Sequence, residues 1–139
     1  MAVVTLIAFS SAASSNARAG VVVVVSARSP VSKLTAAQTA QIFLGKSSTF
    51  PGGSHAIPLD QDEGSDVRNE FYAKVIGKSP TQLNAYWSRI IFSGDGQPPE
   101  VVSGNTAVRK AVADNPEAVG YIDERAVDSS VRIVLTPSE

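Results

Sequence analysis

The sequence has no cysteine and a single histidine. These absences exclude disulfides, thiolate chemistry and the usual zinc sites built from cysteine and histidine. Charge of one sign is also lacking, because 12 basic and 13 acidic residues give a formal net charge of −1. The two signs are mixed along the chain, so no basic stripe is present and nucleic acid is not an expected partner. No apolar run is long enough to span a bilayer, which predicts a soluble protein.

The length of 139 residues and the 43% hydrophobic content predict one globular domain. At the amino terminus, residues 3–9 form a short apolar run, and Ala17-Arg18-Ala19 is an A-x-A pattern before Gly20. We therefore expect residues 1–19 to be a signal peptide and residues 20–139 to be a single exported domain. No Lys or Arg precedes the apolar run, which departs from the usual signal and leaves an N-terminal extension as the alternative.

The first part of this domain predicts a β-α-β arrangement. Residues 21–25 are five consecutive valines, and such a run is typical of a strand that is buried on both faces. Thr35 is a suitable N-cap for a helix over residues 36–44, which Gly45 ends. A turn with Pro and Gly follows, and residues 56–59 form a short second strand.

Three more helices and two more strands are expected after residue 60. Gly64-Ser65 opens a helix with Ser65 as its N-cap, Ser79-Pro80 opens the next, and residues 103–105 open the last. Trp87 falls on the apolar side of the second of these helices and is expected in the core. Residues 119–122 and 131–135 read as closing strands. The predicted fold class is α/β, with a mixed sheet of about four strands and helices packed on its faces.

None of the polar clusters has a catalytic pattern. His55 has no nucleophile beside it, and Ser65 lacks the G-x-S-x-G elbow, so we expect neither an enzyme nor a cofactor. Four carboxylates lie close together at Asp60, Asp62, Glu63 and Asp66, but their spacing departs from that of a calcium-binding EF-hand loop. The preferred interpretation is a solvated acidic loop, with no metal site.

Three segments occur in a characteristic order: Gln-Ile-Phe-Leu-Gly-Lys at 41–46, an acidic Gly-Ser segment at 60–66, and Pro-Glu-Ala-Val-Gly-Tyr-Ile-Asp at 116–123. Together they resemble one lobe of a phosphate-type periplasmic solute-binding protein of ABC transporters, a type II periplasmic binding protein. The resemblance covers residues 21–135. It departs from the family in the middle segment. An Arg-Ser-Asp-Gly-Ser-Gly-Thr loop is usual there, but residues 60–66 of this chain contain no arginine.

The resemblance implies a ligand site where the helix after Gly64 begins. Helix N-termini attract anions, because the first backbone N–H groups have no partner within the helix. The expected ligand-binding residues are Gly64, Ser65, Asp66 and Arg68, with a small oxyanion such as phosphate as the ligand. Two alternatives stay open: Gly64-Ser65 only turns and caps the chain, and Arg68 pairs with Asp62 or Asp66.

Two functions follow from these observations. The first is an exported solute-binding protein that presents a small oxyanion to an ABC permease or a sensor. The chain has material for one lobe of the usual two-lobed clamshell, so a homodimer could supply the second lobe. The second is a ligand-free interaction module that contacts a membrane sensor or an envelope protein. Stabilisation by a small anion distinguishes the first function from the second.

Overall fold

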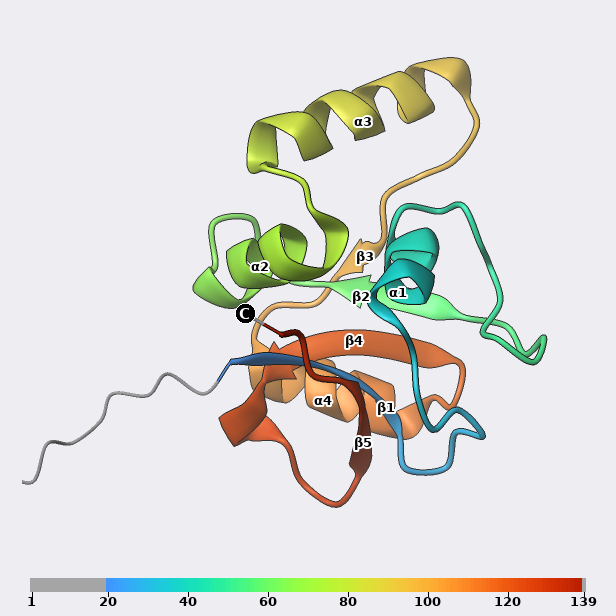
Figure 1. The fold of residues 1–139 in the computed structure, drawn as a ribbon, viewed down its shortest axis with the longest axis vertical. Helices are drawn as coiled ribbons and strands as arrows, with labels where there is room; N and C mark the ends of the chain where they lie inside the picture. Colours follow the sequence, from blue (N-terminus) through green and yellow to red (C-terminus); the bar gives the residue numbers. More distant parts are fainter. Residues whose placement is uncertain (1–19, 139) are drawn as a thin grey trace, which may run out of the picture.

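The computed structural model describes residues 20–138, and the predicted signal peptide at 1–19 lies outside this range. A five-stranded mixed sheet has the strand order β3-β2-β4-β1-β5 and carries helices on both faces (Figure 1). The strands are β1 (Val21–Ser26), β2 (Ile57–Asp60), β3 (Glu100–Val101), β4 (Ala118–Asp123) and β5 (Val131–Leu135). β2 runs parallel to β3 and β4, whereas β1 runs antiparallel to β4 and β5.

The valine run forms β1, an inner strand between β4 and β5, and it is buried on both faces as the sequence predicts. All six residues of β1 are buried. Val21, Val23 and Val25 enter the larger apolar cluster, and Val22 and Val24 enter the smaller one on the opposite face. Because side chains alternate between the faces of a strand, a β-strand with a core on each side needs an unbroken apolar sequence.

The helices divide between the two faces of the sheet. α4 (Asn105–Asp114) places Val108 and Val112 in the smaller cluster. The larger cluster takes its helical residues from α1 (Ala36–Phe43), α2 (Asp66–Phe71), the π-helix η1 (Tyr72–Ile76) and α3 (Pro80–Ser93). A short 3-10 turn, η2 (Glu124–Ala126), joins β4 to β5. No helix of residues 20–138 is long and apolar enough to cross a membrane.

The predicted helix starts are confirmed at three capping residues. The Thr35 and Ser79 side chains each accept a hydrogen bond from the backbone N–H three residues later and complete a capping box with Gln38 and Gln82. The Ser65 Oγ accepts from the Arg68 N–H at the start of α2. α4 differs, because its N-cap is Gly104, which has no side chain to cap with.

α3 is anchored to the rest of the chain by few residues. Only Leu83 and Trp87 are buried along its 14 residues, which confirms Trp87 as a core residue. The Tyr86 hydroxyl donates to the Leu44 carbonyl over 2.6 Å, and the Trp87 ring packs beside Gly45 at the end of α1. The rest of the helix lies above the body of the chain (Figure 1).

The sheet has five strands where the sequence predicts about four, and the additional strand is β3. β3 has only two residues, and it directly follows Pro98 and Pro99. Two residues cannot show the alternation by which a strand is recognised in a sequence. β3 forms because it pairs with β2, and the Val102 N–H extends the pairing by donating to the Asp60 carbonyl over 2.9 Å.

Candidate functional site

The expected ligand residues lie where the chain leaves β2 and enters α2. Gly64 has a φ of +87°, a left-handed conformation that glycine adopts without strain. The Ser65 N–H donates to the Asp62 carbonyl, and the Ser65 Oγ accepts from the Arg68 N–H, both over 3.2 Å. Asp66 is in the first turn of α2. The structure therefore confirms the turn at Gly64 and the cap at Ser65, and it places Asp66 directly after them as the first residue of α2.

The sequence left open a pair between Arg68 and Asp62 or Asp66. In the structure Arg68 pairs with Asp60 instead. Its Nε donates to Asp60 Oδ1 over 3.4 Å, and its guanidinium lies 4.9 Å from the centre of the Tyr72 ring. Asp60 itself is only 3% exposed, so the description of the acidic segment as a solvated loop is wrong at this residue. Asp60 is the last residue of β2, and its side chain points into the protein, while Asp62 and Glu63 are exposed.

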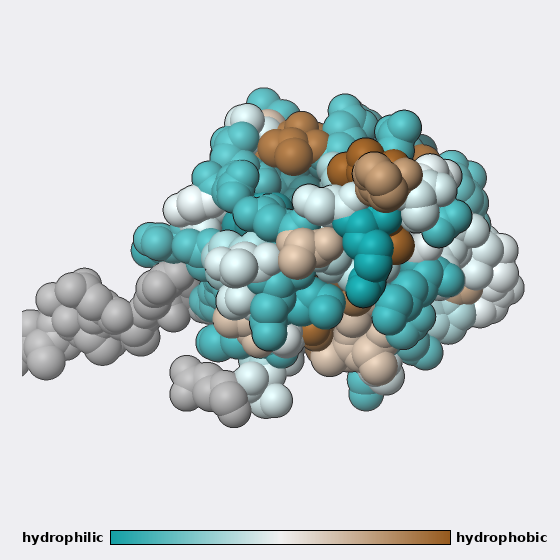
Figure 2. Space-filling model, turned by 90° about the horizontal axis from the view of Figure 1, so that it is seen from above, coloured by the Kyte–Doolittle hydropathy of each residue, from teal (hydrophilic) through white to brown (hydrophobic). Residues whose placement is uncertain are grey.

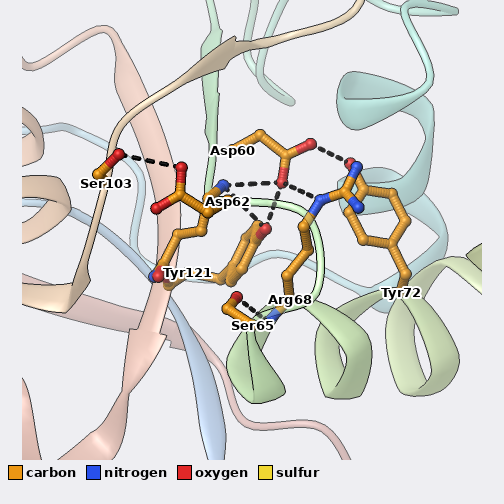
Figure 3. Close-up of polar contacts among 8 residues, drawn as sticks. Asp60, Asp62, Ser65, Arg68, Tyr72, Ser103 and Tyr121 are labelled. Atoms are coloured by element: carbon orange, nitrogen blue, oxygen red, sulfur yellow. Dashed lines mark hydrogen bonds and ion pairs between the residues drawn. The ribbon is translucent and has the colours of Figure 1, made fainter.

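A buried polar cluster forms around the Asp60 carboxylate (Figure 3). Its Oδ2 accepts from the Tyr72 hydroxyl over 2.6 Å. Its Oδ1 accepts from the Tyr121 hydroxyl, from the Gln61 N–H over 2.9 Å and from Arg68. With Asp60, these four residues are called the Asp60 cluster below. Since buried charges are stable only when paired and hydrogen-bonded, the cluster accounts for a carboxylate inside the fold.

Aromatic packing holds the two tyrosines of the cluster in place. The Tyr121 ring stacks on Phe71, with ring centres 4.0 Å apart and an angle of 8° between the rings. Tyr72 meets Phe71 edge to face at 5.2 Å. Both tyrosines therefore have a fixed apolar body and a hydroxyl that reaches the carboxylate.

The charge states of the cluster follow from burial and from Asp60. Burial raises the pKa of both Tyr72 and Tyr121, and the neighbouring Asp60 raises both values further. Burial lowers the pKa of Arg68, but Asp60 and the two tyrosines outweigh this effect and raise it overall. The hydroxyls thus stay protonated as donors and Arg68 stays charged.

We expect the stability of the fold to fall above about pH 10, where tyrosines of the unfolded chain ionise. The folded state keeps these protons because its tyrosine pKa values are raised. Each tyrosine should therefore remove up to about 1.4 kcal/mol of unfolding free energy per pH unit above that point. Urea denaturation between pH 8 and 11 measures the slope. A Tyr72→Phe/Tyr121→Phe variant should have a flatter profile, and equal slopes in both proteins would contradict the assignment.

A second group of contacts ties this loop to the start of α4. The Gln61 Nε2 donates to the Tyr121 carbonyl over 2.8 Å and to Asn105 Oδ1 over 3.0 Å. The same Asn105 oxygen accepts from the Asp123 N–H over 3.1 Å. Ser103 donates through its Oγ to Asp62 Oδ1 over 3.0 Å (Figure 3). The loops that follow β2 and β3 are therefore joined at one edge of the sheet.

This edge offers hydrogen-bond donors to a small ligand and no site for a metal. The Ser65 hydroxyl and the first backbone N–H groups of α2 are donors at the surface. Within residues 20–138, no group of three or more His, Asp or Glu side chains is placed to hold a metal ion. In sheets of this kind, ligands bind beyond the carboxyl ends of the parallel strands, which is where the loops after β2 and β3 lie.

The cluster was missed in the sequence because its members are far apart. Tyr72 and Tyr121 are 12 and 61 residues from Asp60. One local signal was available, since Arg68 and Tyr72 are four residues apart and so share a face of a helix. Asp60 directly follows the predicted strand at 56–59, and Arg68 and Tyr72 come soon after it in the sequence. Together these residues indicate a buried ion pair.

The fold is that of one lobe of a periplasmic binding protein. No protein family and no curated protein matches the sequence of this chain. Among solved structures, it is similar to an ABC-type phosphate transport receptor from Vibrio cholerae, with 23% identity and a TM-score of 0.68. That match covers 86% of this chain and 48% of the receptor.

Two further structures have the same fold. One is a Clostridium perfringens protein described as a phosphate ABC transporter substrate-binding protein with bound phosphate, at 24% identity and a TM-score of 0.66. The match covers 83% of this chain and 44% of that protein. The other is PstS from Borrelia burgdorferi, at 15% identity, a TM-score of 0.60, and coverage of 83% and 46%. The chain thus spans about half the length of each.

Proposed function

We propose that this chain is one lobe of an exported solute-binding protein. It recognises a small oxyanion at the start of α2, and phosphate is the preferred candidate. The observation that carries the proposal is the fold, which is shared with the phosphate-binding proteins named above. Gly64, Ser65 and Asp66 provide the binding loop, and Arg68 supplies positive charge from behind it. The ligand would pass to an ABC permease or a sensor.

The acidic character of the loop favours phosphate over sulfate. Asp62, Glu63 and Asp66 add carboxylates at the surface, and these repel a fully ionised anion. Phosphate near neutral pH keeps at least one O–H, which can donate to a carboxylate, whereas sulfate has none. The Ser65 hydroxyl and the backbone N–H groups then meet the remaining oxygens. A second lobe, from another copy or another polypeptide, would enclose the ligand.

The melting temperature of the whole chain should rise with phosphate and not with sulfate. A concentration of one hundred times the Kd stabilises a protein by about 2.7 kcal/mol, so the rise should reach several degrees there and keep growing with the logarithm of the phosphate concentration. Ser65→Ala should abolish the response, because it removes both the cap and a ligand donor. Ser79→Ala is the matched control, since it removes a cap of the same 3.2 Å length at the start of α3. No response of the unmodified chain to phosphate would refute the proposal.

A further inference from the structure

A hollow of about 300 Å³ lies between α3 and the end of the sheet at β3. We call it the α3 hollow. The apolar part of its wall comes from α3 and from the segment that leads into β3: Leu83, Trp87, Ile91, Pro98, Pro99 and Val101. Binding pockets for small molecules are of this kind, with apolar walls and a few polar groups, and this volume is at the small end of their range.

The polar groups that line the α3 hollow are Asn84 and Ser88 of α3 and two members of the Asp60 cluster. Asp60 and Arg68 both line it, and their side chains are 5% and 15% exposed. Asp60 is fully engaged by the tyrosines and Gln61. The contact between Arg68 and Asp60 uses Nε, and a guanidinium carries four more N–H donors on its two terminal nitrogens. The Arg68 guanidinium is therefore held in place by Asp60 and also lines the hollow.

The rim of the hollow leaves apolar surface in contact with water. Ile91 and Val101 are each 54% exposed, although both line the hollow. Figure 2 looks down on α3 and shows hydrophobic groups interrupting a largely hydrophilic face. Because covering such surface is favourable, a ligand with an apolar body gains free energy by binding between these side chains.

We propose that the α3 hollow binds a small carboxylic acid with an apolar body, such as a short alkyl or aryl acid. Its carboxylate pairs with the terminal nitrogens of Arg68, since guanidinium and carboxylate groups match in shape. Its apolar body lies between Trp87 and Val101. A monoanion fits better than a dianion, because Asp60 already offsets much of the charge of Arg68. This site shares Arg68 with the proposed oxyanion site but none of Gly64, Ser65 and Asp66, and it goes beyond the proposed function.

Trp87 gives a direct readout, because it lines the hollow and is the single tryptophan of the chain. Titration of the whole chain with phenylacetate or hexanoate should change the Trp87 fluorescence in a saturable way. The neutral analogue 2-phenylethanol should bind at least about tenfold more weakly than phenylacetate, because it cannot form the charge-assisted pair with Arg68.

Two variants on α3 test the location. Ser88→Phe fills the hollow, which Ser88 lines, and should weaken acid binding at least about tenfold. Ala85→Phe places the same ring on an exposed position of α3 that does not line the hollow, and should bind like the unmodified chain. Ser88→Phe should leave any phosphate response intact, which separates this proposal from the previous one. The proposal is overturned by a non-saturable signal with both acids, by equal binding of the alcohol, or by unchanged binding in Ser88→Phe.

Discussion

Replacement of Asp60 by alanine is expected to lower the free energy of unfolding by about 3–5 kcal/mol, the range for breaking a buried ion pair on one side. The change leaves the Arg68 guanidinium and two tyrosine hydroxyls without their shared acceptor. Such unpaired buried groups lose hydration without a compensating hydrogen bond. Urea denaturation of the two proteins at pH 7 measures the difference.

Asp62→Ala is the control for this experiment. Asp62 is exposed and accepts a side-chain hydrogen bond from Ser103. Its loss should therefore change stability by less than about 1 kcal/mol. A second test adds Tyr121→Phe to Asp60→Ala, which removes one stranded hydroxyl and should recover part of the loss. Equal effects of Asp60→Ala and Asp62→Ala would show that the buried cluster does not stabilise the fold.

Gly120→Val should destabilise the fold by about 3 kcal/mol, at the upper end of the usual range for overpacking a core. Gly120 lies in β4 directly beneath α4. A Cβ at this position would be 2.7 Å from Val108 Cγ1 and 3.2 Å from Val112 Cγ2. Both valines are fully buried, so neither can move aside without shifting the helix. Thermal or urea denaturation measures the loss.

The steric reason for this effect can be tested separately. Gly120→Ala alone should cost about 1–3 kcal/mol, and adding Val108→Ala should cost less than the sum of the two single changes. Gly96→Ala is the matched control, because its Cβ would lie at an ordinary 3.4 Å from Ile90 Cγ2 and its φ is not positive. That change should be neutral or slightly stabilising. Strict additivity at Gly120 and Val108 would argue against the clash.

The predictable parts of the fold were those set by neighbours in the sequence. The valine run predicts a strand buried on both faces, and the Thr35, Ser65 and Ser79 caps predict three helix starts. The two-residue strand β3 was not predictable in this way, because it exists through its pairing with β2.

The same reasoning separates the two halves of the candidate site. The turn at Gly64 and the cap at Ser65 are local, so the sequence shows them. The burial of Asp60 depends on Tyr121, which β4 brings from 61 residues away. Without knowledge of that partner, a carboxylate in an acidic segment is expected to be solvated. For the same reason the sequence suggested Asp62 or Asp66 as the partner of Arg68, and not Asp60.

The position of β1 also determines when the chain can fold. β1 precedes the other four strands of residues 20–138 in the sequence, yet both of its neighbours, β4 and β5, come after all of the others (Figure 1). Neither side of the valine run can be paired until residues 118–135 have been made. Pairing over such a sequence distance is slow, and an unpaired β-branched run is prone to aggregate. Among the strands of residues 20–138, β1 is therefore the one that waits longest for its partners during synthesis.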